Sequence, residues 1–228
     1  MTSNVYKIRD ICRRNLVKYT LETLSLIPGI DDFSVLDMGC GTGESVLALL
    51  GNLKCRVVAI DSDTGCVSTL NEKVNVLRLE NRIKVIHGSV FDQNLIYEQF
   101  DLVMAEGLLN IIGFETGLAL MLKYLKQSGV LLIHDQLEND EEKRILFKKY
   151  ALKVISTLEL NETIWWNEYY GCLESYLSTG EVSSFTKEIN EISEYKKNPE
   201  KNRSIIYLLG YGNLRTIDNR RNLEMSKG

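Results

Sequence analysis

The chain reads Val35-Leu-Asp-Met-Gly-Cys-Gly-Thr-Gly43 where a short apolar strand runs into three glycines. Glycine lets the backbone turn tightly and approach a ligand closely. The helix expected from Glu44 offers unpaired N–H groups in its first turn. Asp61 closes the next expected strand, 22 residues after Gly39, where a carboxylate can accept the hydroxyls of a ribose. The pattern indicates a nucleoside-containing ligand at the end of the first strand.

Around this loop, apolar strands alternate with helical segments. The expected strands are Phe33–Met38, Arg56–Ile60, Ile83–His87, Asp101–Ala105, Val130–Ile133, Leu152–Leu160 and Arg203–Gly210. The expected helices cover residues 5–26, 44–50, 65–79, 115–126, 140–150 and, between the last two strands, much of 162–197. Such alternation predicts a mainly parallel sheet with helices on both faces. Ligands of these sheets bind beyond the carboxyl ends of the strands.

Composition narrows the class of protein. The 228 residues carry a net charge of −4, and the sequence pI of about 5.4 disfavours a nucleic-acid partner. Apolar runs stay short of the roughly 18 residues of a membrane span, and the N-terminus lacks the apolar core of a signal peptide. Five cysteines without a C-x-x-C pair predict neither a disulfide framework nor a zinc site. We therefore expect a cytoplasmic protein without a membrane partner.

The charge of the loop distinguishes two candidate ligands. In a dinucleotide-binding loop the third conserved position is glycine or alanine, and here it is Glu44. A carboxylate repels a pyrophosphate, whereas S-adenosylmethionine (SAM) has no phosphate and carries a sulfonium and an ammonium. Asp37 and Glu106 add negative charge to the same region. The sequence therefore favours SAM over NAD.

The same residues carry a family resemblance. Val35–Gly43 closely resembles the first motif of class I SAM-dependent methyltransferases, and the segments at 58–61, 87–92, 100–106 and 125–134 resemble the later motifs in order. The resemblance implies a Rossmann-like, doubly wound, seven-stranded α/β sheet with an antiparallel last strand. It implies an N-terminal helical segment at 1–30, a methyltransferase domain at 31–212 with a helical cover at 162–197, and a polar tail at 213–228.

The resemblance also implies which residues hold the cofactor. The loop residues Gly39, Cys40, Gly41 and Gly43 hold the methionine part of SAM, with Asp37 near its ammonium. Asp61 and Ser62 take the ribose, Ser89 and Val90 border the adenine, and Glu106 lies near the transferred methyl. Ser89 stands where this family often has an acid. Glu106-Gly-Leu-Leu109 differs from the N-P-P-Y motif of adenine and glutamine methyltransferases.

The candidate residues for binding and activating the acceptor lie at the strand ends and in one aromatic run. Glu106, His134 and Asp135 are candidate general bases, although His134 also suits a packed histidine at the sheet rim. No metal is expected. Trp165, Trp166, Tyr169 and Tyr170 either anchor a helix on the core or line an acceptor pocket. With Glu168 and Glu174 nearby, such a pocket fits a cationic amine.

These features together predict the activity. We expect transfer of a methyl group from SAM, leaving S-adenosylhomocysteine, to a small-molecule acceptor that presents an amine or a hydroxyl. Two alternatives stay open: a SAM-binding regulatory module without turnover and, with less support, an NAD-linked oxidoreductase. The sequence fits either a monomer or a homodimer.

Overall fold

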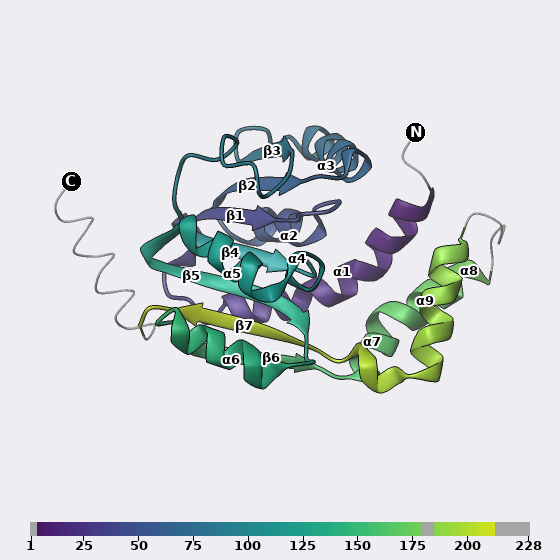
Figure 1. The fold of residues 1–228 in the computed structure, drawn as a ribbon. Helices are drawn as coiled ribbons and strands as arrows, with labels where there is room; N and C mark the ends of the chain where they lie inside the picture. The colour runs from purple at the N-terminus through teal and green to yellow at the C-terminus, as the bar shows by residue number, and fades with distance from the viewer. Residues whose placement is uncertain (1–3, 179–184, 213–228) are drawn as a thin grey trace.

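A computed structural model of the protein describes residues 4–178 and 185–212 (Figure 1). The strands are β1 (Ser34–Met38), β2 (Arg56–Asp61), β3 (Ile83–His87), β4 (Phe100–Glu106), β5 (Leu125–Gln136), β6 (Lys153–Leu160) and β7 (Ser204–Gly210). The α-helices are α1 (Asn4–Leu24), α2 (Glu44–Asn52), α3 (Thr64–Leu77), α4 (Leu109–Ile112), α5 (Phe114–Lys123), α6 (Asp140–Lys149), α7 (Glu162–Trp165), α8 (Gly171–Leu177) and α9 (Thr186–Lys197). Shorter turns are η1 (Ile30–Asp32), the π-helical η2 (Trp166–Tyr170) and η4 (Pro199–Asn202).

The strands form one seven-stranded sheet in the order β3-β2-β1-β4-β5-β7-β6. β1, β2, β3, β4 and β5 pair in parallel, and β7 runs antiparallel to both β5 and β6. The predicted fold class is thereby confirmed. The strand order reverses between β1 and β4, and in open α/β sheets such a reversal opens a crevice at the carboxyl ends of the strands.

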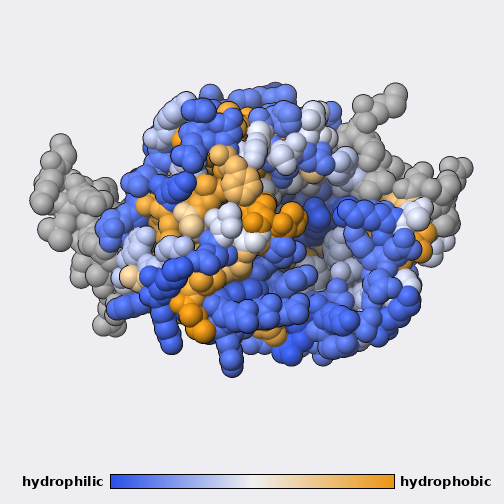
Figure 2. Space-filling view, viewed as in Figure 1, coloured by the Kyte–Doolittle hydropathy of each residue, from blue (hydrophilic) through white to orange (hydrophobic). Residues whose placement is uncertain are grey.

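Both faces of the sheet are covered, which explains the continuous apolar strands. On one face, core residues of α1, α2 and α3 pack against alternate strand residues such as Val35 and Leu102. On the other face, core residues of α4, α5 and α6 pack against the intervening ones such as Leu36 and Val103. Figure 2 shows apolar side chains gathered near the centre of the second face, where Figure 1 draws α4 and α5.

Some element boundaries differ from the prediction. β5 begins at Leu125 rather than Val130, because Leu125 pairs with Phe100 across a register shift in β4. The short helix α4 was not expected. The helical cover expected between the last two strands consists of α7, η2, α8 and α9. The division into 1–30, 31–212 and a tail stays a prediction, and the tail at 213–228 lies outside the described residues.

A disulfide joins the N-terminal helix to this helical cover. Cys12 of α1 and Cys172 of α8 are bonded, with their Cα atoms 5.7 Å apart. The expectation that the cysteines form no disulfide is therefore wrong: the partners lie 160 residues apart in sequence, beyond the reach of spacing rules. Cys40, Cys55 and Cys66 take part in no disulfide among the described residues. Within the described part of the chain, no helix is both long and apolar enough to cross a membrane.

Candidate active site

A cleft of about 550 Å³ lies where the strand order reverses. Its walls come from the glycine loop after β1, the ends of β2, β4 and β5, the inner side of α1, and the helical cover with the start of β7. In Figure 1 the cover lies beyond the carboxyl ends of β1 and β4. The cleft therefore has one half next to the glycine loop and another half next to the cover.

The glycine loop has the backbone conformation that its sequence requires. Gly39, Gly41 and Gly43 have φ angles of 74°, 54° and 82°. A β-carbon on Gly43 would lie 2.3 Å from Cδ1 of Leu70, so a side chain there meets both strain and a clash. Asp61 accepts a hydrogen bond from the backbone N–H of Gly41 at 2.7 Å. The acid at the end of β2 and the loop after β1 thus form one wall of the cleft.

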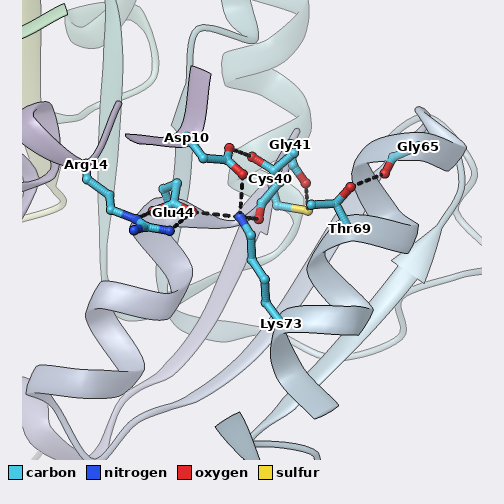
Figure 3. Close-up of polar contacts among 9 residues, drawn as sticks. Asp10, Arg14, Cys40, Gly41, Glu44, Gly65, Thr69 and Lys73 are labelled. Atoms are coloured by element: carbon cyan, nitrogen blue, oxygen red, sulfur yellow. Dashed lines mark hydrogen bonds and ion pairs between the residues drawn. The ribbon is translucent and has the colours of Figure 1, made fainter. Parts of the chain in front are cut away.

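A network of salt bridges and hydrogen bonds around Lys73 and Asp10 holds the glycine loop in place (Figure 3). Lys73 of α3 donates to Asp10 of α1 at 2.8 Å, to Glu44 at 2.6 Å and to the Thr42 carbonyl at 2.9 Å. Asp10 also accepts a hydrogen bond from the Thr42 hydroxyl, and Arg14 pairs with Glu44 at 2.5 Å. The network joins α1, α2 and α3 around the loop. Asp10 and Lys73 could not be recognised from the sequence, because the residues they contact lie at least 29 positions away in it.

This network changes the charge argument for the cofactor. Glu44 is paired with two cations, so it does not offer the free negative charge that the sequence analysis assigned to it. Asp37 keeps that role, since its side chain lines the cleft and has no hydrogen bond among the described residues. Burial raises the pKa of Asp37 well above its usual value, and Glu106 and Asp61 raise it further. A buried carboxyl of this kind is stabilised as an anion when a cation binds beside it.

Glu106 at the end of β4 has both carboxylate oxygens occupied. It accepts hydrogen bonds from Thr20 of α1 and Ser45 of α2, each at 2.5 Å. The carboxylate joins three elements and lines the cleft at the junction of its two halves. Each oxygen keeps a second lone pair for a ligand donor.

His134 and Asp135 at the end of β5 both line the cleft. His134 Nε2 lies 2.9 Å from the Ser204 hydroxyl of β7. Burial lowers the pKa of His134, against the opposing effect of Glu106 and Asp135, so the imidazole is neutral. Asp135 is paired with Lys143 of α6 at 2.7 Å, while its Oδ1 is buried without a hydrogen-bond partner among the described residues. This oxygen is therefore an unpartnered acceptor that is shielded from solvent rather than open to the cleft.

The aromatic run divides between the cleft and the core. Trp165 and Tyr170 line the cleft. Tyr169 packs in a cluster beside the disulfide, and the Trp166 ring stacks on Tyr195 at 5.4 Å. A regular α-helix would bring Trp165 next to Tyr169 and Trp166 next to Tyr170. The first pair is formed, with ring centroids 6.0 Å apart, and Trp165 also contacts Tyr170 at 6.1 Å. The second contact fits the π-helical turn, whose wider i to i+5 hydrogen bonding brings Trp165 and Tyr170 to one side.

Gly171 makes this π-helical turn sterically feasible. Its N–H donates to the Trp166 carbonyl, five residues earlier, and a β-carbon on it would lie 2.9 Å from that oxygen.

The two carboxylates that made a cationic acceptor plausible in the sequence form salt bridges instead: Glu168 with Lys18 at 2.6 Å and Glu174 with Lys196 at 2.5 Å. Neither of them lines the cleft.

The cleft brings together most of the predicted cofactor residues but not all of them. Asp37, Gly39, Cys40, Gly41, Gly43, Asp61 and Glu106 line it. Ser62, Ser89 and Val90 are absent from the described residues that line it. Ser89 instead accepts a hydrogen bond from the backbone N–H of Phe91. No group of three or more His, Cys, Asp or Glu side chains in the described ranges is placed to hold a metal ion.

A doubly wound sheet with a glycine loop after β1, an acid at the end of β2 and a cleft between them is typical of α/β proteins that bind a nucleoside-containing ligand at the carboxyl ends of the strands. A family model described as a methyltransferase domain matches residues 35–129. The match begins with the glycine-loop motif and ends within β5.

Curated relatives match part of the chain. Carboxy-S-adenosyl-L-methionine synthase of Shewanella sp. (strain ANA-3) is 25% identical over 147 residues, 58% of this chain and 58% of that protein. An uncharacterized protein of Haemophilus influenzae is 24% identical over 131 residues, 55% of this chain and 52% of that protein. The chain thus spans about half the length of the curated relatives it matches.

Solved structures share the fold at low identity. A SAM-dependent methyltransferase from Thiobacillus denitrificans, in complex with S-adenosyl-L-homocysteine, has a TM-score of 0.65 and 16% identity, over 85% of this chain and 89% of that chain. The [4+2]-cyclase SpnF has a TM-score of 0.72 and 13% identity, over 86% of this chain and 82% of that chain. Residues 35–129 thus match a methyltransferase domain, and the chain has the same fold as these solved structures, in agreement with the resemblance seen in the sequence.

Proposed function

We propose that the protein transfers a methyl group from SAM to a small-molecule acceptor bound under the helical cover. The observation that carries the proposal is the continuous cleft, which runs from Asp61 and the glycine loop to Trp165 and Tyr170. SAM supplies the reactive methyl, and the task of the protein is to align donor and acceptor. Alignment of this kind contributes on the order of 7–11 kcal/mol to lowering a barrier.

Residues of the first half of the cleft would hold SAM. The two oxygens of Asp61 already accept backbone N–H groups of Gly41 and Asp63, and their remaining lone pairs suit ribose hydroxyls. The buried Asp37 suits the ammonium. Arg13 of α1 lines the same half and forms no ion pair or hydrogen bond among the described residues. Its guanidinium therefore suits the carboxylate of the methionine part.

Residues of the second half would hold the acceptor. Of the two acceptor classes predicted from the sequence, a hydroxyl agrees better with the charges than an amine, since Glu168 and Glu174 are neutralised away from the cleft. Glu106, which lines the cleft and keeps lone pairs for a ligand, and Asp135, whose buried Oδ1 has no partner among the described residues, are the candidate bases for the hydroxyl proton. Lys143 holds the other oxygen of the Asp135 carboxylate and so fixes its orientation.

Turnover tests the proposal. The protein is incubated with SAM and pools of small hydroxyl and amine compounds, and S-adenosylhomocysteine is measured by mass spectrometry. We expect its formation to depend on one pool, to cease in Asp61→Ala and to fall strongly in Asp135→Asn. Asp101→Asn is a matched control, because Asp101 binds Ser34 and Lys126 at the opposite end of β4. SAM binding without turnover in any pool would favour the regulatory module instead.

A further inference from the structure

A short chain of hydrogen bonds crosses the acceptor half of the cleft. Trp165 Nε1 donates to the Ser204 hydroxyl oxygen at 2.9 Å. His134 Nε2 lies 2.9 Å from the same oxygen. The three side chains come from the helical cover, from β7 and from β5, and all three line the cleft.

The chemistry of these groups fixes the direction of the bonds. An indole N–H only donates, so Trp165 occupies one lone pair of Ser204. The serine hydroxyl has one proton to donate, and the residue as a whole is 5% exposed. Among the described residues its hydroxyl has two partners, and of these His134 Nε2 alone can accept a proton. The reverse arrangement, with Nε2–H donating, would leave a buried hydroxyl proton without an acceptor, which is unfavourable.

The direction of these bonds determines the tautomer of His134. Because the imidazole is neutral and its Nε2 accepts from Ser204, the ring proton lies on Nδ1. Nδ1 has no hydrogen-bond partner among the described residues. Asp135 Oδ1 is the only side-chain nitrogen or oxygen described that is both shielded from solvent and without a partner, so Nδ1 is not shielded from solvent. It is therefore accessible from the cleft, where it offers a donor rather than a base.

The surroundings of this N–H suit an oxygen. The Trp165 ring stacks on the His134 ring, with centroids 6.1 Å apart and planes 29° apart, and offers a flat apolar wall. Lys201 and Arg203 line the same half of the cleft. Lys201 forms no ion pair within the described ranges, and Arg203 is paired with Glu159 at 3.2 Å and with Glu162 at 3.8 Å, neither of which lines the cleft. These cations offset the negative charge of Glu106 and Asp135, which line the cleft beside His134.

We propose that Trp165 and Ser204 hold His134 as the Nδ1–H tautomer, and that this N–H binds a carboxylate or carbonyl oxygen of a planar acceptor. The part that concerns the acceptor rests on the proposed function, whereas the tautomer does not. His134 is then a positioning residue for the acceptor, and the general-base role expected from the sequence does not fall to it.

Long-range ¹⁵N–¹H NMR of the imidazoles tests the tautomer. The chain has two histidines, and His87 is an internal comparison: its Nε2 lies 3.2 Å from the Ser62 carbonyl, which only accepts and so favours Nε2–H, and 3.1 Å from the Thr64 hydroxyl, which can donate or accept. We expect Nδ1–H for His134 and Nε2–H for His87. Ser204→Ala should move His134 toward Nε2–H, whereas Trp166→Phe, whose ring stacks on Tyr195, should not. Nε2–H predominating for His134 in the wild-type protein would overturn the proposal, even if the Ser204 variant failed to fold.

Two probes test the recognition of an oxygen. Sodium benzoate and benzylammonium chloride are titrated separately into the protein saturated with S-adenosylhomocysteine, and the His134 ring resonances are followed. We expect the dissociation constant obtained from these shifts to be at least tenfold lower for benzoate than for benzylammonium. His134→Gln should weaken benzoate binding. Preference for benzylammonium, or no response to either probe, would contradict the acceptor part. Failure of S-adenosylhomocysteine to bind would instead contradict the proposed function and leave the tautomer result valid.

Discussion

Removal of the Arg13 guanidinium should weaken binding of the amino-acid part of the cofactor and leave binding of the nucleoside part intact. Nη1 of Arg13 lies 4.0 Å from where a β-carbon on Gly41 would stand, at the part of the glycine loop assigned to the methionine moiety. The guanidinium has no ion pair to give up among the described residues. Binding a carboxylate therefore does not compete with an existing salt bridge.

The exposure of Arg13 decides the magnitude. A buried charge-assisted hydrogen bond contributes about 1.5–3 kcal/mol. Arg13 is exposed at the rim, where solvent screens the pair, so the contribution falls to about 1 kcal/mol. That value corresponds to roughly a fivefold change in dissociation constant.

Calorimetric titration with two ligands measures this contribution. S-adenosylhomocysteine carries the carboxylate, and 5′-methylthioadenosine has the same nucleoside without the amino acid. We expect Arg13→Ala to weaken the first about fivefold and the second hardly at all. Arg14→Ala is the matched control, because the neighbouring side chain binds Glu44 behind the loop. Equal losses for both ligands in Arg13→Ala would refute the assignment.

Three further predictions follow from buried or strained groups. Because burial raises the pKa of Asp37 in the free protein, and a cofactor ammonium beside it would lower that pKa, binding of S-adenosylhomocysteine should weaken as the pH falls. Calorimetry in buffers of different ionisation enthalpy should show proton release on binding, and this release should be absent in Asp37→Asn. Gly171→Ala should disrupt the π-helical turn and change the tryptophan fluorescence, while an unchanged spectrum and melting temperature would contradict the clash with Trp166. Reduction of the Cys12–Cys172 disulfide should lower the free energy of unfolding by about 2–4 kcal/mol and the melting temperature with it. The melting temperature of Cys12→Ser should not respond to reductant.

The fold could be predicted from the sequence because its signals are local. Each buried strand is an apolar run, each helix has its own periodicity, and the glycine loop is specified by nine consecutive residues, Val35–Gly43. Asp61 could be placed as well, since the second strand of such a sheet must end beside the first. The boundary errors occurred where pairing with a neighbour decided the element, as for the start of β5.

The contacts that complete the site are not local. Cys12 and Cys172 lie 160 residues apart, His134 and Ser204 lie 70 apart, and Asp10 lies 32 before Thr42. A single sequence carries no signal for such pairs. The aromatic run was assigned only in part for a different reason: the turn at 166–170 is π-helical, so a period of 3.6 places Trp165 beside Tyr169 but not beside Tyr170, which it also contacts.

The charge of Glu44 shows how a correct conclusion can rest on an incomplete reason. Its position in the loop was predicted, but its pairing with Arg14 and Lys73 was not. The preference for a cationic cofactor therefore depends on Asp37, which is buried and without a partner in the described part of the chain. A lone carboxylate in the wall of a cleft is a stronger indication than an acid counted in the sequence.

Direct titration of the purified protein with S-adenosylhomocysteine, beside NADH, tests the central claim most directly. We expect the first ligand to bind with a stoichiometry of about one and NADH not to bind, because a pyrophosphate would lie against Asp37 and Glu106. Asp61→Ala should abolish that binding, and Asp101→Asn should retain it. Binding of NADH alone, or of neither ligand, would contradict the assignment of this cleft to SAM.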